Sequence, residues 1–205
     1  ISDMNEPLGE MVGNAVEIYE CVKILRGESG EKMRPTVELS IELSARILIL
    51  TKTAETIEEA RAKIQNALDS GTGLERFRRN VELQNGDARI CDNPDVLFGE
   101  NLIECPIESK KSGFVEQIDA AAIGAAIGAI GGGRTRAEDR IDHAVGCRIA
   151  AKIGDAVKSG AALGVLYCRD RNQAHLIGEK LRNAYKIGEE KPQNLKLVRE
   201  IISGW

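Results

Sequence analysis

A short loop near the start of the chain carries residues that could bind a cation. Pro7-Leu8-Gly9 precedes the core of an expected helix over residues 10–25. Such a loop can turn its carbonyl oxygens inward, while the first helical turn leaves N–H groups unpaired. A carboxylate further along the helix, at Glu17 or Glu20, could join those carbonyls around a hard cation, which prefers oxygen ligands. The spacing is equally compatible with two solvent-exposed glutamates, so both interpretations stay open.

The side chains give little support for hydrolytic chemistry. Neither of the two histidines, His143 and His175, lies in the His-Glu-x-x-His pattern of a zinc protease, and the sequence has no Gly-x-Ser-x-Gly elbow. A cysteine–histidine pair assembled in space is compatible with the spacing, but no local pattern marks one. We expect His143 in a loop and His175 on a helix surface.

Two glycine-containing segments match ligand-binding patterns only in part. Gly131-Gly132-Gly133-Arg134 lacks the spacing of a P-loop or a dinucleotide loop, and it follows a helix where both need a strand, so we expect a tight turn. The stretch 152–160 has the rhythm of a lipoyl- or biotinyl-type hairpin, without the Met-Lys pair of such carriers in the residues that follow. A stand-alone lipoyl/biotinyl-like scaffold or binding module without catalysis is therefore the alternative to an enzyme.

The elements that must position these residues fall into two groups. The first group is helical, and the apolar spacing predicts helices over residues 10–25 and 36–53, a third with an apolar stripe from Ile57 to Leu68, and a fourth that ends at Asn85-Gly86-Asp87. The third and fourth of these helices start at the capping-box patterns Thr56–Glu59 and Thr72–Glu75. The second is apolar around most of its circumference, so we expect it to be buried on several sides.

The second group begins near residue 99 and is rich in strands. Apolar runs between turn signals predict strands over residues 102–107, 114–118, 145–150 and 163–168. Pro106 indicates that the first of these is an edge strand. Helices are expected after the capping residue Asp119 and over 172–187, and a tail element over 195–202.

The composition excludes several classes of protein. The 205 residues carry 28 Lys and Arg against 32 Asp and Glu, a formal net charge of −4, with 3% aromatic residues. This balance disfavours nucleic-acid binding by bulk charge or base stacking. No apolar run reaches the roughly 20 residues that span a bilayer, and no signal peptide is visible. Five widely spaced cysteines predict reduced thiols. We expect a cytoplasmic protein with no nucleic-acid or membrane partner.

Several segments, in one order along the chain, resemble the pyrimidine-nucleoside and thymidine phosphorylases. The first is Ser2-Asp3-Met4-Asn5-Glu6-Pro7-Leu8-Gly9, followed by Val12-Gly13-Asn14-Ala15. The further matching segments are 25–28, 58–61, 70–77, 131–134, 139–146 and 154–160. The resemblance covers nearly the whole chain, and the number of separate matches makes it specific.

The resemblance implies an enzymatic function for the parent protein. Members of this family are pentosyltransferases that split thymidine- or uridine-type nucleosides with inorganic phosphate, giving the base and a pentose 1-phosphate. Their phosphate- and base-binding residues lie upstream of the segment that matches Ile1, so no catalytic or substrate-binding residue is expected in this part. The chain thus resembles the C-terminal half of such an enzyme, and the isolated chain is expected to be inactive. A relative acting on a purine nucleotide shares the fold and is a third interpretation.

The resemblance also implies a cation site and partners. Bacterial members bind a monovalent cation, potassium, through backbone carbonyls and one glutamate. By motif alignment Leu8 and Met11 offer the carbonyls and Glu20 the carboxylate. Glu6 and Met11 stand where the family pattern has Gln and Ala. The remaining cation ligands, and most of the interface of an expected homodimer, would come from the missing N-terminal half.

The implied fold class is α/β followed by α+β. Residues 1–95 are expected to form the end of an α/β phosphorylase domain, with one strand and four helices. Residues 96–205 are expected to form a β-rich α+β C-terminal domain of hammerhead or barrel-sandwich type.

Overall fold

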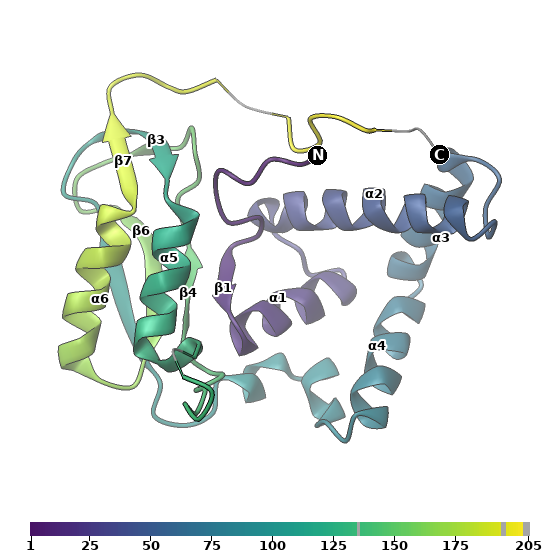
Figure 1. The fold of residues 1–205 in the computed structure, drawn as a ribbon, viewed down its shortest axis with the longest axis horizontal. Helices are drawn as coiled ribbons and strands as arrows, with labels where there is room; N and C mark the ends of the chain where they lie inside the picture. Colours follow the sequence, from purple (N-terminus) through teal and green to yellow (C-terminus); the bar gives the residue numbers. More distant parts are fainter. Residues whose placement is uncertain (135, 194–195, 203–205) are drawn as a thin grey trace. The chain divides into compact units, whose positions relative to one another are not determined.

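A computed structural model describes residues 1–134, 136–193 and 196–202, and the chain divides into two compact units (Figure 1). Unit 1 consists of Ile1–Ile18 and Leu97–Trp205, and unit 2 of Tyr19–Val96. The first 18 residues are therefore grouped with the C-terminal part of the chain. Among the described residues both units contain helices and the sheets lie in unit 1, so the fold is mixed α+β. The finer hammerhead description stays a prediction.

Unit 1 is built on two antiparallel sheets. The larger sheet has the strand order β1-β4-β6-β2, formed by Met11–Gly13, Gly146–Ile149, Ala162–Cys168 and Ile103–Glu108. The smaller sheet has the order β5-β3-β7, formed by Ala156–Val157, Gly113–Ile118 and Tyr185–Gly188. Pro106 lies in β2, at the edge of the larger sheet. This confirms the edge prediction, because proline lacks the N–H that a central strand needs.

Unit 1 also contains two complete α-helices and a π-helical turn at Gly128–Gly132. Helix α5 (Ala120–Ile127) packs against α6 (Arg171–Asn183), and α6 also packs against β2 and β6. The carboxylate of Asp119 accepts the Ala122 N–H at 2.9 Å, which confirms the predicted cap of α5. The interior is aliphatic, and its largest fully buried side chains include Ile107, Ile123, Ile149, Leu163, Leu166 and Leu181.

Two predicted helix boundaries in this unit are wrong, and strand pairing explains both. Residues 11–13 form β1, which pairs with β4, so α1 (Ala15–Leu25) starts later than residue 10. Residues 185–188 form β7, which pairs with β3, so α6 ends at Asn183. Both segments are apolar enough for either structure, and only a partner strand far away in sequence decides between them. Leu195 of the expected tail element lies outside the described residues, and Val198 forms an isolated bridge with Ser2.

Unit 2 is helical. After the end of α1 it contains α2 (Arg34–Leu50), α3 (Ile57–Asp69) and α4 (Thr72–Leu83), with short 3-10 turns at Glu31–Met33, Ala88–Cys91 and Pro94–Leu97. The Thr56 hydroxyl accepts the Glu59 N–H at 3.2 Å, which confirms the predicted start of α3. The predicted cap at Thr72 is wrong: Gly71, in the left-handed conformation with φ of 74°, is the N-cap, and Thr72 is already helical.

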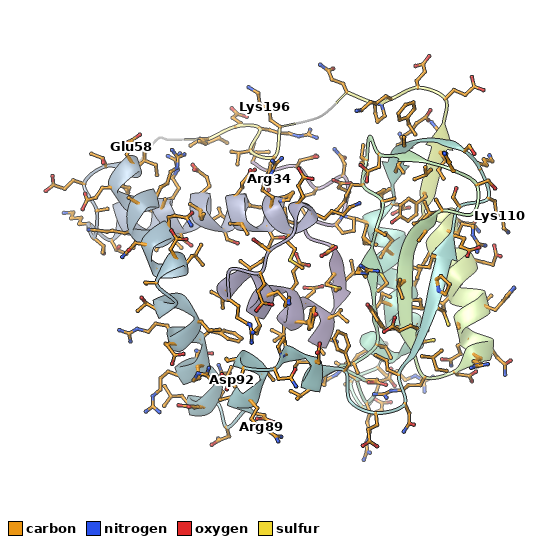
Figure 2. The ribbon with its side chains drawn as sticks, turned by 180° about the vertical axis from the view of Figure 1, so that it is seen from behind. Arg34, Glu58, Arg89, Asp92, Lys110 and Lys196 are labelled. Carbon is orange, nitrogen blue, oxygen red and sulfur yellow. The ribbon has the colours of Figure 1, made fainter. Side chains whose placement is uncertain are left out.

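The expectation that the second helix is buried on several sides is also wrong. In α2 the side chains of Leu43, Ile47 and Leu50 are 56%, 57% and 79% exposed. Helix α3 covers another face of α2, where Ala45 and Ala60 are buried. Charged side chains such as Glu58, Arg89 and Asp92 cover the outside of this unit (Figure 2). Within the described part of the chain, no helix combines the length and the apolarity needed to span a bilayer.

Candidate functional site

The turn Pro7–Gly9 presents three successive carbonyl oxygens to one ammonium group. The Lys152 Nζ donates to the carbonyl oxygens of Pro7 and Gly9, at 2.6 Å for Gly9, and lies 3.5 Å from that of Leu8. Gly9 is buried and Lys152 is half-buried. An ammonium group has three N–H donors, so it matches three converging acceptors. The loop carbonyls do face a positive charge, and in this structure a side chain of the same chain supplies it.

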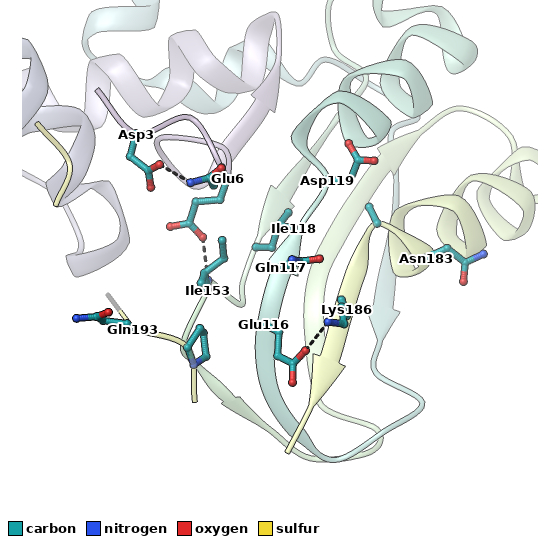
Figure 3. A pocket seen from close by; sticks show the side chains of 13 residues that line it. Asp3, Glu6, Glu116, Gln117, Ile118, Asp119, Ile153, Asn183, Lys186 and Gln193 are labelled. Atoms are coloured by element: carbon teal, nitrogen blue, oxygen red, sulfur yellow. Dashed lines mark hydrogen bonds and ion pairs between the residues drawn. The ribbon is translucent and has the colours of Figure 1, made fainter. Parts of the chain in front are cut away.

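The backbone around Lys152 is held by two carboxylates. The Lys152 N–H donates to the Asp155 carboxylate at 2.9 Å. The Ile153 N–H donates to the Glu6 carboxylate at 2.8 Å (Figure 3). Burial raises the pKa of the Glu6 carboxyl above its usual value, against the opposing effects of the Ile153 N–H and the charge of Lys152. Glu6 thus binds the backbone next to Lys152, and Lys152 in turn binds the carbonyls that follow Glu6. Nothing in the sequence linked residues so far apart.

The predicted cation ligands lie in two different surroundings. Leu8 is half-buried beside Lys152, and Met11, 8% exposed, is paired with Arg148 in the ladder between β1 and β4. Glu20 belongs to unit 2, where it is 4% exposed and accepts the Thr36 hydroxyl at 3.2 Å. The structure therefore brings Leu8 and Met11 into one segment of unit 1. The alternative interpretation of Glu20 as a solvent-exposed residue is wrong, whereas Glu17 is exposed.

A cavity of about 660 Å³ adjoins this loop in unit 1. Its lining includes the carboxylates of Asp3, Glu6, Glu116 and Asp119, and a single basic side chain, Lys186. The Glu116 carboxylate and Lys186 form an ion pair at 2.9 Å across β3 and β7 (Figure 3). An excess of carboxylates repels anions, so this cavity is unsuited to phosphate.

The glycine triplet follows α5: Gly131 and Gly132 close a π-helical turn, Gly128–Gly132, and Gly133 is extended. Gly131 adopts a φ of 96°, and its carbonyl accepts the Asp142 N–H at 2.9 Å. The neighbouring Gly132 carbonyl accepts the Asn14 side-chain amide at 2.9 Å. A Cβ on Gly132 would lie 2.6 Å from the Ile127 side chain, so the backbone needs glycine there for close approach.

The histidines and cysteines take part in no cluster of potential metal ligands within the described residues. His143 is exposed in a loop and His175 is exposed on α6, as predicted. The five cysteines are thiols, and Cys91, Cys147 and Cys168 are buried. Burial raises the pKa of Cys147 to about 12, which leaves its thiol protonated at neutral pH.

Comparison with known proteins shows what this chain is similar to. Residues 114–188 match the model of the pyrimidine nucleoside phosphorylase C-terminal domain. This segment runs from β3 to β7 and contributes β4 and β6, the two central strands of the larger sheet. The two edge strands β1 and β2 come from residues outside it. The match gives no support to the lipoyl/biotinyl-type module.

Several known proteins are similar to this chain over nearly its whole length. The chain is 36% identical over 203 residues to a pyrimidine-nucleoside phosphorylase of Bacillus subtilis, covering 99% of this chain and 46% of that protein. The chain is also 36% identical to a thymidine phosphorylase of Burkholderia orbicola, a match that covers 98% of this chain and 45% of that protein. It is 36% identical to a pyrimidine-nucleoside phosphorylase of Geobacillus stearothermophilus, a match that covers 99% of this chain and 46% of that protein. The predicted resemblance is confirmed: the chain is related over nearly its whole length to these phosphorylases, and it spans about half the length of the curated relatives it matches.

Proposed function

We propose that the protein carrying this chain is a pyrimidine-nucleoside phosphorylase, a pentosyltransferase of nucleoside salvage. In that reaction the C–N bond between pentose and base breaks, and a C–O bond forms between the anomeric carbon and inorganic phosphate. The products are the free base and a pentose 1-phosphate, so phosphate is the co-substrate. The similarity over 99% of the chain to a protein of that name carries this proposal.

We infer that this chain contributes a scaffold domain and that the reacting groups lie in the other half of the enzyme. The cavity beside Glu6 has four carboxylates against one lysine, which disfavours a phosphate ion. The phosphate and base sites then belong to sequence that the longer relatives have in addition. The isolated chain is inactive on this proposal.

A potassium ion held by Leu8, Met11 and Glu20 is a further part of the proposal. Two carbonyl oxygens and a carboxylate are ligands suited to a hard cation. The Leu8 carbonyl is the most distant of the three from the Lys152 ammonium, at 3.5 Å. The enzyme is proposed to act as a cytoplasmic homodimer that includes the N-terminal half.

The test combines the mass of the native protein with an assay of phosphorolysis. The polypeptide that carries this segment is purified from its source, weighed, and incubated with thymidine, uridine or a purine nucleotide, with and without phosphate. We expect a mass well above the 22.3 kDa of this chain, and release of thymine or uracil only when phosphate is present. The 205-residue chain, assayed in parallel, is expected to release no base.

Other outcomes would contradict the proposal in distinguishable ways. Base release by the 205-residue chain alone would refute its inactivity. Release of a purine base from the nucleotide would favour the third interpretation. A native mass equal to that of this chain, without phosphorolysis, would refute the enzyme.

A further inference from the structure

Lys152 differs from the other lysines of unit 1 in what its ammonium group touches. Lys110 and Lys186 form surface ion pairs with Glu179 and Glu116. The ammonium of Lys152 instead lies against the carbonyl oxygens of Pro7, Leu8 and Gly9. Backbone carbonyls that converge on one point repel each other, and a cation between them offsets that repulsion. Three consecutive carbonyls on one ammonium therefore constitute a cation site with an internal occupant.

Backbone hydrogen bonds at Lys152 and Ile153 hold the main chain in position for this contact. Its own N–H is bonded to the Asp155 carboxylate, and the next N–H, of Ile153, is bonded to Glu6 on the far side of the same loop. The Glu10 carbonyl accepts the Ile149 N–H at 2.6 Å, which extends the attachment into the β1–β4 ladder. Residues 6–13 are thus attached along residues 146–155.

The attachment joins a segment inside the matched C-terminal domain to a segment outside it. Residues 146–155 lie inside the matched C-terminal domain, whereas residues 1–13 lie outside it. Strand β1 covers an edge of β4. The Lys152 contact is a charged link between the loop carbonyls and that domain.

We propose that Lys152 is the resident cation of the Pro7–Gly9 turn. Its ammonium fills a monovalent-cation site made of backbone carbonyls and thereby locks the N-terminal segment onto the C-terminal domain. When the side chain is shortened to leave room, the site takes a small cation with N–H donors, ammonium or methylammonium. This inference concerns the chain's own structure, and it stands or falls separately from the proposed phosphorolysis.

The test measures amide hydrogen exchange of the full chain by peptide mass spectrometry. The variants are Lys152→Ala, Lys152→Met and the control Lys158→Ala, an exposed lysine of the same hairpin. Losing hydrogen bonds to a charged donor is expected to speed exchange in residues 1–14 of Lys152→Ala by about 10- to 100-fold. Peptides from unit 2 report whether the variant is folded.

Added salts then separate a specific site from ionic strength. Ammonium or methylammonium chloride is expected to restore protection in residues 1–14 of Lys152→Ala, and tetramethylammonium chloride, which has no N–H donor, is not. Equal restoration by all three salts would overturn the proposal. So would wild-type protection in Lys152→Met, because an apolar stem would then suffice, and so would exchange in Lys152→Ala that equals the Lys158→Ala control.

A measurement on the wild-type chain covers the case in which Lys152→Ala fails to fold. Reductive methylation labels lysine ammonium groups according to their access to reagent. Lys152 is expected to react at least about tenfold more slowly than Lys158, because its N–H groups are engaged. Equal rates at the two lysines would refute the assignment.

Discussion

Glu6 offers a sharp test of how burial and a hydrogen bond oppose each other in this loop. Its carboxylate accepts the Ile153 N–H at 2.8 Å, while burial raises its pKa. Glu6→Gln keeps an oxygen acceptor and removes the charge, and Glu6→Ala removes both. Leaving a partly buried N–H without an acceptor costs about 1–2 kcal/mol, so Glu6→Ala should lose about that much stability to urea unfolding. Glu6→Gln should lie within about 0.5 kcal/mol of wild type at pH 7.

The pH dependence distinguishes the two effects by sign. A carboxyl with a raised pKa binds its proton more tightly in the folded chain than in the unfolded chain. Its contribution to stability is therefore present below the unfolded pKa, near 4.5, and is lost as the pH rises through the higher folded pKa. The glutamine variant lacks this titration, so wild type should lose stability relative to Glu6→Gln as the pH rises above about 4.5.

The assay is urea unfolding followed by circular dichroism from pH 4 to pH 7.5, with exposed Glu104→Gln as the matched control. The control should track wild type across this range. If Glu6→Gln instead lost stability relative to wild type with rising pH, the ion would be the favoured native form and the reasoning from burial would be wrong. If Glu6→Gln were as unstable as Glu6→Ala, the hydrogen bond to Ile153 would not be the stabilising contact.

Three further predictions concern backbone, cap and thiols. Gly113→Ala should lower the free energy of unfolding by at least about 2 kcal/mol, because its Cβ would lie 2.3 Å from a β7 carbonyl oxygen and its φ is 152°. Gly124→Ala, which has open space around it in α5, should raise the free energy of unfolding by about 0.5–1 kcal/mol. Urea unfolding midpoints measure both changes. Thr56→Ala should cost about 1 kcal/mol and Thr56→Ser little, measured in the same way. Exposed Cys21 should react with iodoacetamide at pH 8 well before buried Cys147, whose pKa is about 12, and equal labelling in native protein would contradict the core described for unit 1.

Elements with local signals were predictable from the sequence. The cap at Thr56, the cap at Asp119 and the edge position of Pro106 each follow from a side chain that acts on its own backbone neighbourhood. The resemblance to the phosphorylases rests on short ordered segments and is likewise a property of the sequence. The comparisons confirm it.

Elements that depend on a distant partner were predicted wrongly or missed. Residues 11–13 and 185–188 fit a helical pattern, but pairing with β4 and β3 makes them strands. The apolar residues of α2 indicated burial, yet Leu43, Ile47 and Leu50 are exposed because the neighbouring helix covers a different face.

The loop Pro7–Gly9 shows which features the sequence predicts and which depend on tertiary structure. Its residue types predict a tight turn before the next element, because proline and glycine together favour one, and a cation at the turn's carbonyls was one of two open interpretations. The identity of that charge depends on residue 152, which is brought there by the β1–β4 ladder and by the hydrogen bond of Glu6 to Ile153. Sequence therefore determined the resemblance to the phosphorylases, the caps at Thr56 and Asp119, and the turn. Tertiary structure decided the strands, the exposed helix face and the ammonium that fills the turn, since each needs residues that only folding brings into contact.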